Sequence, residues 1–240
     1  MLQSTRGVVL RSVKYGESSL IVTLFTEHYG VQSYLAQGVR KSKRNQTGLL
    51  QPSLLIDLET DHKPNKNLQR LRNFHPSFIY QTIQEDVVKN SIALFSAELL
   101  LRLLPEHAPF QELFDFSFHY FQLLDQSPPQ QAANYPLYFL IRTGQLLGYH
   151  VKGSYSESSP FLDAQEGGFV ANETIGNTLT RQEAMQLALL LEKDHSVFFD
   201  HPLSSATRNA ITDWYLEFLK LHSQHLGALK SLEIIRTILH

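Results

Sequence analysis

A dense cluster of cations lies between Gly38 and Gly48. Four basic side chains fall within five residues there: Arg40, Lys41, Lys43 and Arg44. Cations this close repel one another, and a bound polyanion relieves that repulsion and releases its own counterions. The neutral donors beside them, Ser42, Asn45, Gln46 and Thr47, suit phosphate oxygens. We therefore expect this segment to bind a phosphate backbone, the alternative being a solubilising loop that contacts no ligand.

Residues suited to bond-breaking chemistry are sparse. His222 and His225 are spaced to share one helix face as metal ligands, but no third ligand has matching spacing. His195 and His201 each adjoin an aspartate, without a nucleophile nearby. The chain contains no cysteine and no G-x-S-x-G, Walker or G-x-G-x-x-G motif. We therefore expect no enzyme, no metal and no cofactor, although a triad assembled only in space would leave no local signature.

The net charge of −2 hides an uneven distribution. Residues 1–75 hold eleven Lys and Arg against five Asp and Glu, a net charge of +6, whereas residues 76–240 carry −8. This asymmetry predicts two domains with different partners. A small basic domain attracts polyanions, of which nucleic acid is the commonest. The alternative is a solvated surface whose charges are uneven for no functional reason.

The candidate contacts to nucleic acid are ten basic residues of this first segment. They are Arg6, Arg11, Lys14, Arg40, Lys41, Lys43, Arg44, Lys66, Arg70 and Arg72. Tyr15, Tyr34 and Phe74 could add stacking faces beside these cations, as single-strand binders require. Each of the three aromatics also fits a hydrophobic core, which is the commoner role.

The composition indicates a folded chain of one or two domains. Its 240 residues are 42% hydrophobic and 18% charged, which is enough apolar material for a core and excludes a disordered chain. No apolar run is long enough to span a membrane. The N-terminal residues have no apolar segment of signal-peptide length, so we expect a cytoplasmic protein.

The first domain, residues 1–78, reads as a small β-barrel. Five short segments are rich in β-branched and aromatic residues and are separated by turn residues: 7–13, 19–26, 31–39, 54–58 and 67–74. Five strands are too few for an ordinary sandwich and suit a strongly curved OB-fold barrel. Periodicity alone leaves an SH3-like barrel open.

The pattern of the second domain, residues 79–240, predicts helices alone. A β-barrel followed by a helical domain makes the chain an α+β protein. Helical patterns are expected at 83–104, 113–124, 130–147, from 180 onward, at 208–221 and at 231–239. The second of these is nearly all apolar and should be deeply buried. Thr180 and Glu183 form a capping box, and Gly148 ends the third helix. Residues 152–179 read as an irregular insert with a hairpin at Gly167-Gly168.

Taken in order, several of these segments resemble the RecO family of bacterial recombination mediators. The N-terminal match runs through Thr5–Arg11, Tyr15–Val22, Phe25-Thr26, Tyr29-Gly30, Gly38–Lys41 and Leu49–Pro52. Beyond it, the match is carried by Leu147–Tyr149, Phe161, Gly167-Gly168 and Leu229–Ser231. The resemblance is strong to about residue 75 and patchy afterwards.

The resemblance implies an OB-fold followed by a helical domain, and a role in DNA repair and homologous recombination after DNA damage. It implies binding of single- and double-stranded DNA and annealing of complementary strands. It also implies partnership with RecR and single-strand-binding protein, which together help to load RecA onto DNA. Such a protein would work at the nucleoid of a bacterial cytoplasm and would break no bonds.

Two departures from the family pattern stand out. Many members place four cysteines around the insert and bind zinc there, whereas this chain has no cysteine. We therefore expect no zinc and an insert held by packing alone. After Lys230-Ser231 the family usually has Arg, and this chain has Leu232.

The acidic helical domain would repel DNA, so we expect it to bind proteins. The tail of single-strand-binding protein is acidic and ends in hydrophobic residues, and its site would need an apolar groove rimmed by a cation. Arg142, Lys230 and Arg236 are the candidate partner-binding residues. The alternatives are an RNA-binding OB-fold protein, a scaffold without direct DNA contact, and an enzyme that uses the histidines and the insert.

Overall fold

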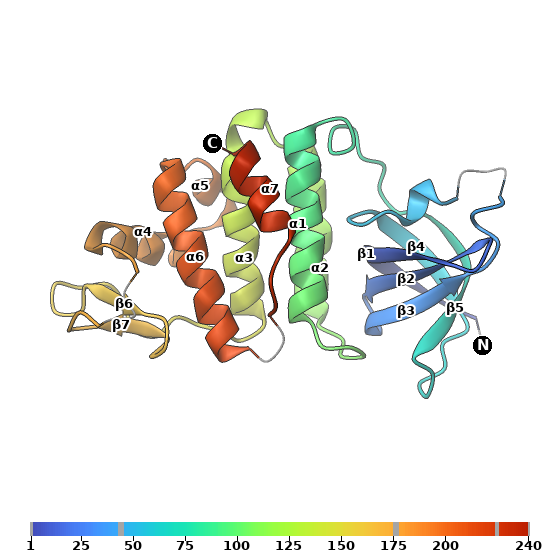
Figure 1. Cartoon of the computed structure of the whole chain (residues 1–240), viewed down its shortest axis with the longest axis horizontal. Helices are drawn as coiled ribbons and strands as arrows, with labels where there is room; N and C mark the ends of the chain where they lie inside the picture. Colours follow the sequence, from blue (N-terminus) through green and yellow to red (C-terminus); the bar gives the residue numbers. More distant parts are fainter. Residues whose placement is uncertain (1, 43–45, 175–177, 224–225, 240) are drawn as a thin grey trace. The chain divides into compact units, whose positions relative to one another are not determined.

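The structure is a computed structural model that describes residues 2–42, 46–174, 178–223 and 226–239. The chain divides into two compact units, Met1–Gln126 and Ser127–His240. The change from strands to helices falls near residue 78 (Figure 1). The first two helices belong to the same compact unit as the strands.

Five strands form a closed barrel in the first unit. They are β1 (Gln3–Tyr15), β2 (Ser19–Thr26), β3 (Gly30–Ala36), β4 (Leu55–Thr60) and β5 (Leu68–Pro76). The strand order is β1-β2-β3-β5-β4, and β4 closes the barrel by pairing with β1. All pairs are antiparallel except β3 with β5. This is the OB-fold that the sequence predicts.

A β-bulge at Leu10 divides the long strand β1 into two parts. Residues Gln3–Val8 pair with β4, and Gly7–Tyr15 pair with β2. The register shifts between Val9 and Arg11, so Leu10 has no partner of its own on β2. Val9 lies in the barrel core, whereas Arg11, two residues later, is exposed. The extra residue therefore turns the odd-numbered side chains of β1 from the inside of the barrel to the outside.

Two helices complete the first unit, α1 (Val87–Leu103) and α2 (Gln111–Gln126). The Asp86 side chain caps α1 by accepting hydrogen bonds from the amides of Val88 and Lys89. Helix α2 is less buried than its apolar sequence predicts, because Leu123 on its outer face is exposed. Its buried face includes Phe114, whose ring packs edge-on against Phe25 of β2, with ring centroids 5.4 Å apart.

The segment between β5 and α1 is fastened to the end of α2. The Asp125 carboxylate accepts hydrogen bonds from the backbone amides of Gln81, Thr82 and Ile83 at 2.8 to 3.1 Å. These hydrogen bonds lower the pKa of Asp125 against the opposing effect of burial. The buried ammonium of Lys89 donates to the Asp125 carbonyl oxygen at 2.9 Å. The buried charges at this junction are thus satisfied by hydrogen bonds.

Arg6 of β1 joins the barrel to α2. Its guanidinium contacts Glu27 at 2.8 Å and Asp115 at 3.0 Å. It also lies over the rings of Phe114 and Phe118, 5.3 and 4.9 Å from their centroids. The two carboxylates and the two aromatic rings therefore hold the Arg6 guanidinium within the first unit.

The second unit is helical. Its helices are the 3₁₀ segment η2 (Pro129–Asn134), α3 (Tyr135–Leu146), α4 (Arg181–Glu192), α5 (His195–Phe199), α6 (Ser205–His222) and α7 (Ser231–Ile238). Thr180 and Glu183 form the predicted capping box, and Gly148 ends α3 with φ of +87°. Trp214, Tyr215 and Phe218 of α6 are buried in the core. Gly144 of α3 allows this packing, because a Cβ there would meet the Tyr215 hydroxyl.

The insert contains the predicted hairpin, built from β6 (Phe161–Asp163) and β7 (Gly168–Val170). The buried Asp163 carboxylate accepts hydrogen bonds from the amides of Gln165 and Glu166 and from the Thr174 hydroxyl. The expectation that packing alone holds the insert is therefore wrong, because a carboxylate organises its turn. Over the part of the chain that the structure describes, no three metal-ligating side chains gather.

Across the described ranges, no helix combines the length and the apolar character needed to cross a membrane.

The Arg6 ion pairs generate a prediction for stability. Hydrogen bonding from Arg6 lowers the pKa of Glu27 below its ordinary value of 4.5. Glu27 therefore stabilises the fold fully above that value, and the contribution disappears as the pH falls through the lowered pKa. We expect Glu27→Gln to cost about 1 kcal/mol of unfolding free energy at pH 7, because a partly exposed charged hydrogen bond weakens.

Urea unfolding at pH 7 and at successively lower pH measures this effect. The difference between Glu27→Gln and the wild type should shrink as the pH falls below 4.5 and through the lowered pKa of Glu27. Glu112→Gln is the control, because Glu112 is exposed on α2 and forms no ion pair among the described residues. Equal losses of unfolding free energy in Glu27→Gln and Glu112→Gln would contradict the stabilising role assigned to the Arg6–Glu27 pair.

Candidate nucleic-acid interface

The outer face of β1, β2, β3 and β5 carries the candidate site. Cross-strand pairing puts Val13, Ile21, Leu35 and Arg70 in one row over these four strands. A second row holds Arg11, Thr23, Ser33 and Leu68. Both rows face outward, because the intervening row contains the fully buried Val22 and Tyr34. The two rows therefore form one continuous surface.

An apolar surface lies between two arginines on this face. We call Val13, Ile21, Leu35 and Leu68 the aliphatic strip. Val13 and Leu68 are 44% and 39% exposed, which is high for strand aliphatics with no polar role. Neighbouring strands are about 4.8 Å apart, so β1 and β5 lie roughly 14 Å apart across the sheet. Arg11 on β1 and Arg70 on β5 thus flank the strip.

One end of the outer face is covered and the other is open. Phe25 belongs to the same face of β2 and is covered by Phe114 of α2. Tyr15, at the far end of β1, is 53% exposed and continues the outward row of Arg11 and Val13. The open end therefore offers one aromatic face beside the aliphatic strip.

The start of the basic segment is fixed beside the turn between β1 and β2. The Arg40 guanidinium donates to the Gly16 carbonyl at 2.9 Å, and its backbone amide donates to the Ser18 carbonyl at 2.9 Å. The Lys41 ammonium lies 3.0 Å from the Glu17 carboxylate. Both cations are thus held at the end of the barrel where Tyr15 is exposed. Lys43 and Arg44 lie outside the described residues.

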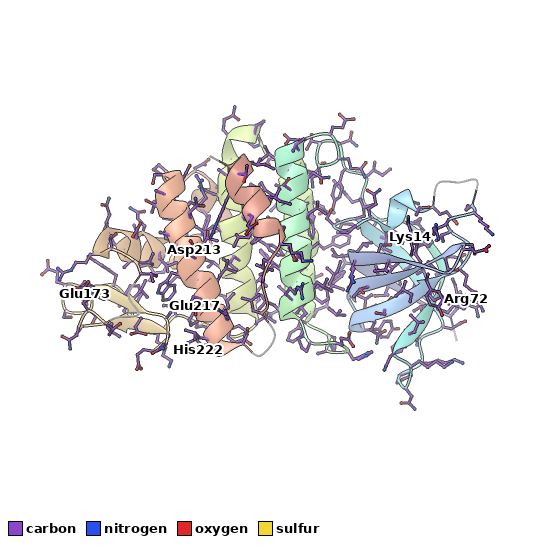
Figure 2. The ribbon with its side chains drawn as sticks, in the orientation of Figure 1. Lys14, Arg72, Glu173, Asp213, Glu217 and His222 are labelled. Atoms are coloured by element: carbon purple, nitrogen blue, oxygen red, sulfur yellow. The ribbon has the colours of Figure 1, made fainter. Side chains whose placement is uncertain are left out.

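Lys14 and Arg72 lie near the same end of the barrel (Figure 2). Lys14 pairs with Leu20 near the end of β1, and its side chain is exposed. Arg72 follows Leu71, the last residue of β5 that pairs with β3, and its Nε donates to Asp61 at 2.6 Å. Five described cations therefore surround the aliphatic strip and its open end: Arg11, Lys14, Arg40, Lys41 and Arg70. A sixth, Arg72, lies beside them.

The loop between β4 and β5 presents Lys66 in an ordered conformation. The buried Gln69 side chain accepts from the Lys63 amide and donates to the carbonyls of Lys63 and Lys66, at 2.7 to 2.9 Å. The Lys66 side chain itself is exposed. Gln69 is therefore a positioning residue for a basic loop, and nothing in its sequence context marks it as one.

Arg6 does not join this surface. Its guanidinium is engaged by Glu27 and Asp115 and covered by aromatic rings of α2. We leave it out of the proposed interface.

Of the three candidate stacking residues, only Tyr15 presents an exposed ring. Tyr34 is fully buried in the barrel core, and burial raises the pKa of its hydroxyl. Phe74 packs against the same core. Tyr34 and Phe74 thus take the commoner role that the sequence offered for them, a place in or against the hydrophobic core. The aliphatic strip was missed, although the alternation of Arg11, Val13 and Tyr15 could have indicated it.

Two of the four histidines that suggested chemistry, His222 and His201, have structural partners. His222 Nε2 lies 2.9 Å from the Ala164 carbonyl, which ties α6 to the insert. His201 contacts Lys193 and Gln186 at 3.1 and 2.6 Å, and burial lowers its pKa. His225 lies outside the described residues, and the side chain of His195 is not described.

A five-stranded barrel with a cation-flanked outer face is the arrangement of OB-fold proteins that bind nucleic acid. Residues 1–79 match the family described as Recombination protein O N terminal, and residues 84–233 match Recombination protein O C terminal. The chain belongs to the RecO family of DNA repair proteins.

Relatives of similar length support this assignment. The DNA repair protein RecO of Phocaeicola vulgatus is 30% identical over 240 residues, which is 99% of each chain. The protein of the same name from Bacteroides fragilis is 30% identical over 241 residues, again 99% of each chain. That of Flavobacterium psychrophilum is 27% identical over 236 residues, 98% of each.

Proposed function

We propose that this protein binds single- and double-stranded DNA on the outer face of its barrel and anneals complementary strands during recombinational repair. The observation that carries this proposal is the aliphatic strip flanked by Arg11 and Arg70, with Lys14, Arg40 and Lys41 at its open end. Membership of a DNA repair family supports the choice of DNA over another polyanion.

Annealing requires that phosphates are neutralised while base edges stay free to pair. Arginine and lysine side chains around the strip would hold the backbone. The strip is aliphatic, with Tyr15 as its exposed aromatic, so it would contact sugars and bases without the strong stacking that traps bases on aromatic platforms. Two strands held weakly in this way could pair without any bond-breaking group.

Sequence-specific readout is not expected. The site is a sheet surface, and none of the described helices of the first unit carries a basic recognition face. Affinity would depend on backbone charge and would fall steeply with salt.

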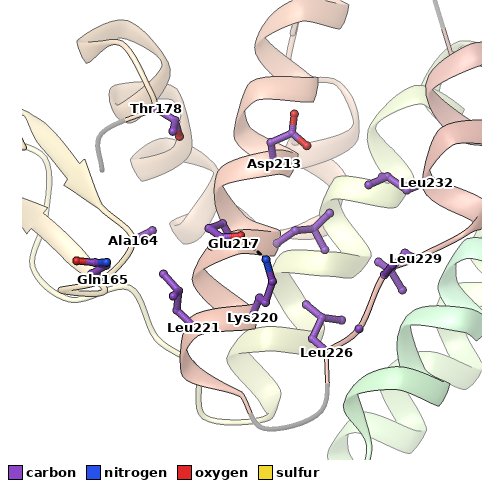
Figure 3. A pocket seen from close by; sticks show the side chains of 13 residues that line it. Ala164, Gln165, Thr178, Asp213, Glu217, Lys220, Leu221, Leu226, Leu229 and Leu232 are labelled. Atoms are coloured by element: carbon purple, nitrogen blue, oxygen red, sulfur yellow. Dashed lines mark hydrogen bonds and ion pairs between the residues drawn. The ribbon is translucent and has the colours of Figure 1, made fainter. Parts of the chain in front are cut away.

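The second unit would serve protein partners, namely RecR and the tail of single-strand-binding protein, and through them the loading of RecA. A groove of about 770 Å³ lies along α6 and the segment before α7 (Figure 3). Its wall is rich in leucine: Leu216, Leu221, Leu226, Leu229 and Leu232. Lys220 lines it as an exposed cation, 3.3 Å from Glu217. An acidic peptide with a hydrophobic end would match this combination.

The three sequence-predicted cations differ in their relation to the groove. Lys230 adjoins Leu229, which lines it, and is exposed. Arg236 is paired with Asp213, another lining residue. Arg142 is half-buried in α3 and donates to Gln145 at 2.8 Å. Lys220 lines the groove and Lys230 adjoins a lining residue, so these two are the preferred cations for the tail. Lys220 was not predicted from the sequence.

Titration of a fluorescent single strand of about 30 nucleotides at several salt concentrations tests DNA binding. Arg11→Gln and Arg70→Gln should each reduce the log–log salt slope by about 0.7, because each removes one phosphate contact. Reversal of Arg40, Lys41, Lys43 and Arg44 to Glu should nearly abolish binding while the fold persists. Arg102→Gln, an exposed arginine of α1, is the control with the same charge change.

No binding by the wild type at low salt would reject the DNA proposal for the isolated chain. Equal losses in Arg70→Gln and Arg102→Gln would show that total charge, and not the barrel face, sets the affinity. A matched RNA strand that binds more tightly would favour an RNA-binding role.

Binding of a labelled acidic peptide with a hydrophobic C-terminus tests the groove. Lys220→Glu and Lys230→Glu should each weaken binding about tenfold, the effect expected when a charged contact becomes repulsive. Arg142→Glu should have little effect. A large loss in Arg142→Glu with none in Lys220→Glu would move the tail site to α3.

A further inference from the structure

We propose that Glu17 and Asp61 are built-in competitors of the phosphate backbone, which occupy two cations of the DNA site and limit its affinity. This inference rests on the proposed function. It concerns two carboxylates whose partners, Lys41 and Arg72, are both among the predicted contacts to nucleic acid.

Glu17 holds Lys41 in a solvent-exposed pair. The carboxylate and ammonium are 3.0 Å apart, and their side chains are 89% and 66% exposed. Exposed pairs of this kind contribute little to stability, so the carboxylate exchanges easily for another anion. A phosphate presents the same kind of oxygen to the same ammonium. Because Arg40 anchors the segment through the Gly16 and Ser18 carbonyls, Lys41 would stay in place during the exchange.

Asp61 holds Arg72 of β5 in a less exposed pair, whose side chains are 29% and 40% exposed. The guanidinium contacts the Asp61 Oδ2 atom through both Nε and Nη2. The hydrogen bond from Arg72 lowers the pKa of Asp61, so the carboxyl is ionised at neutral pH. A guanidinium satisfied by a carboxylate must release it before it can bind a phosphate in the same fork geometry.

Apart from Arg40, which anchors the basic segment, the cations of the site therefore fall into two groups. Lys41 and Arg72 are each paired with a carboxylate, and we call them the guarded cations. Arg11, Lys14 and Arg70 form no ion pair within the described ranges, and we call them the open cations. An arriving strand would engage the three open cations first. Exchange at the guarded cations then leaves Glu17 and Asp61 as free anions beside the phosphates, which favours release. An annealing protein must release its strand once the complementary strand has paired with it, so limited affinity favours annealing.

Oligonucleotide titrations of Glu17→Gln and Asp61→Asn test this inference. Each variant should bind about two- to fivefold more tightly at low salt, because the competing anion is gone. Each should also steepen the log–log salt slope by up to about 0.7, since the cation released from its carboxylate can make one full phosphate contact. Stopped-flow dissociation should be slower in both variants.

Two controls separate local competition from a change in net charge. Glu112→Gln makes the same charge change on α2, away from the guarded cations, and should leave affinity and slope almost unchanged. In a Lys41→Gln background, Glu17→Gln should lose its effect, because the pair that it breaks is already absent. Tightening by Glu112→Gln equal to that by Glu17→Gln would overturn the inference.

The outcomes also distinguish this inference from the proposed function. Normal binding by the wild type, with unchanged affinity in Glu17→Gln and Asp61→Asn, would overturn the inference alone. Absence of DNA binding by the wild type would overturn both. Because Glu17 is highly exposed, its substitution tests the inference even if Asp61→Asn disturbs the loop between β4 and β5.

Discussion

A single extra residue in β1 determines what this barrel shows to solvent. Before the bulge at Leu10, odd-numbered side chains such as Val9 point into the core, and after it Arg11, Val13 and Tyr15 point outward. Without the bulge, two-residue alternation would carry an arginine into the core. The local irregularity of one strand thus creates the exposed row on which the candidate DNA site depends.

Closure of the barrel then brings distant cations to the same surface. The parallel pairing of β3 with β5 sets Leu35 beside Arg70 and so adds a basic strand to the far side of the aliphatic strip. Helix α2 covers the opposite end of the outer face, where Phe114 packs on Phe25 and Arg6 is engaged by carboxylates. The cations of the barrel therefore divide into those that hold the fold together and those that remain available to a ligand.

Local signals in the sequence were sufficient for the strands, the capping box at Thr180 and the hairpin at Gly167, because these depend on neighbouring residues. The partners of individual cations depend on long-range contacts that no local pattern reports. Arg6 meets Asp115 across 109 positions of the chain. Tyr34 has an aromatic ring that could stack on a base, yet strand register places it inside the barrel. The sequence therefore predicted the basic domain better than it predicted which of its side chains face solvent.

The most direct test of the outer-face site is a map of backbone amide NMR shifts in the full-length chain titrated with a single-stranded oligonucleotide. Shift changes should cluster on Arg11, Val13, Ile21, Leu35 and Arg70, with the segment that leads to Lys41, and should weaken as salt is added. The amide shifts of the covered end around Phe25 should remain unchanged. Saturable changes confined to the second unit, with the barrel unaffected, would contradict the account.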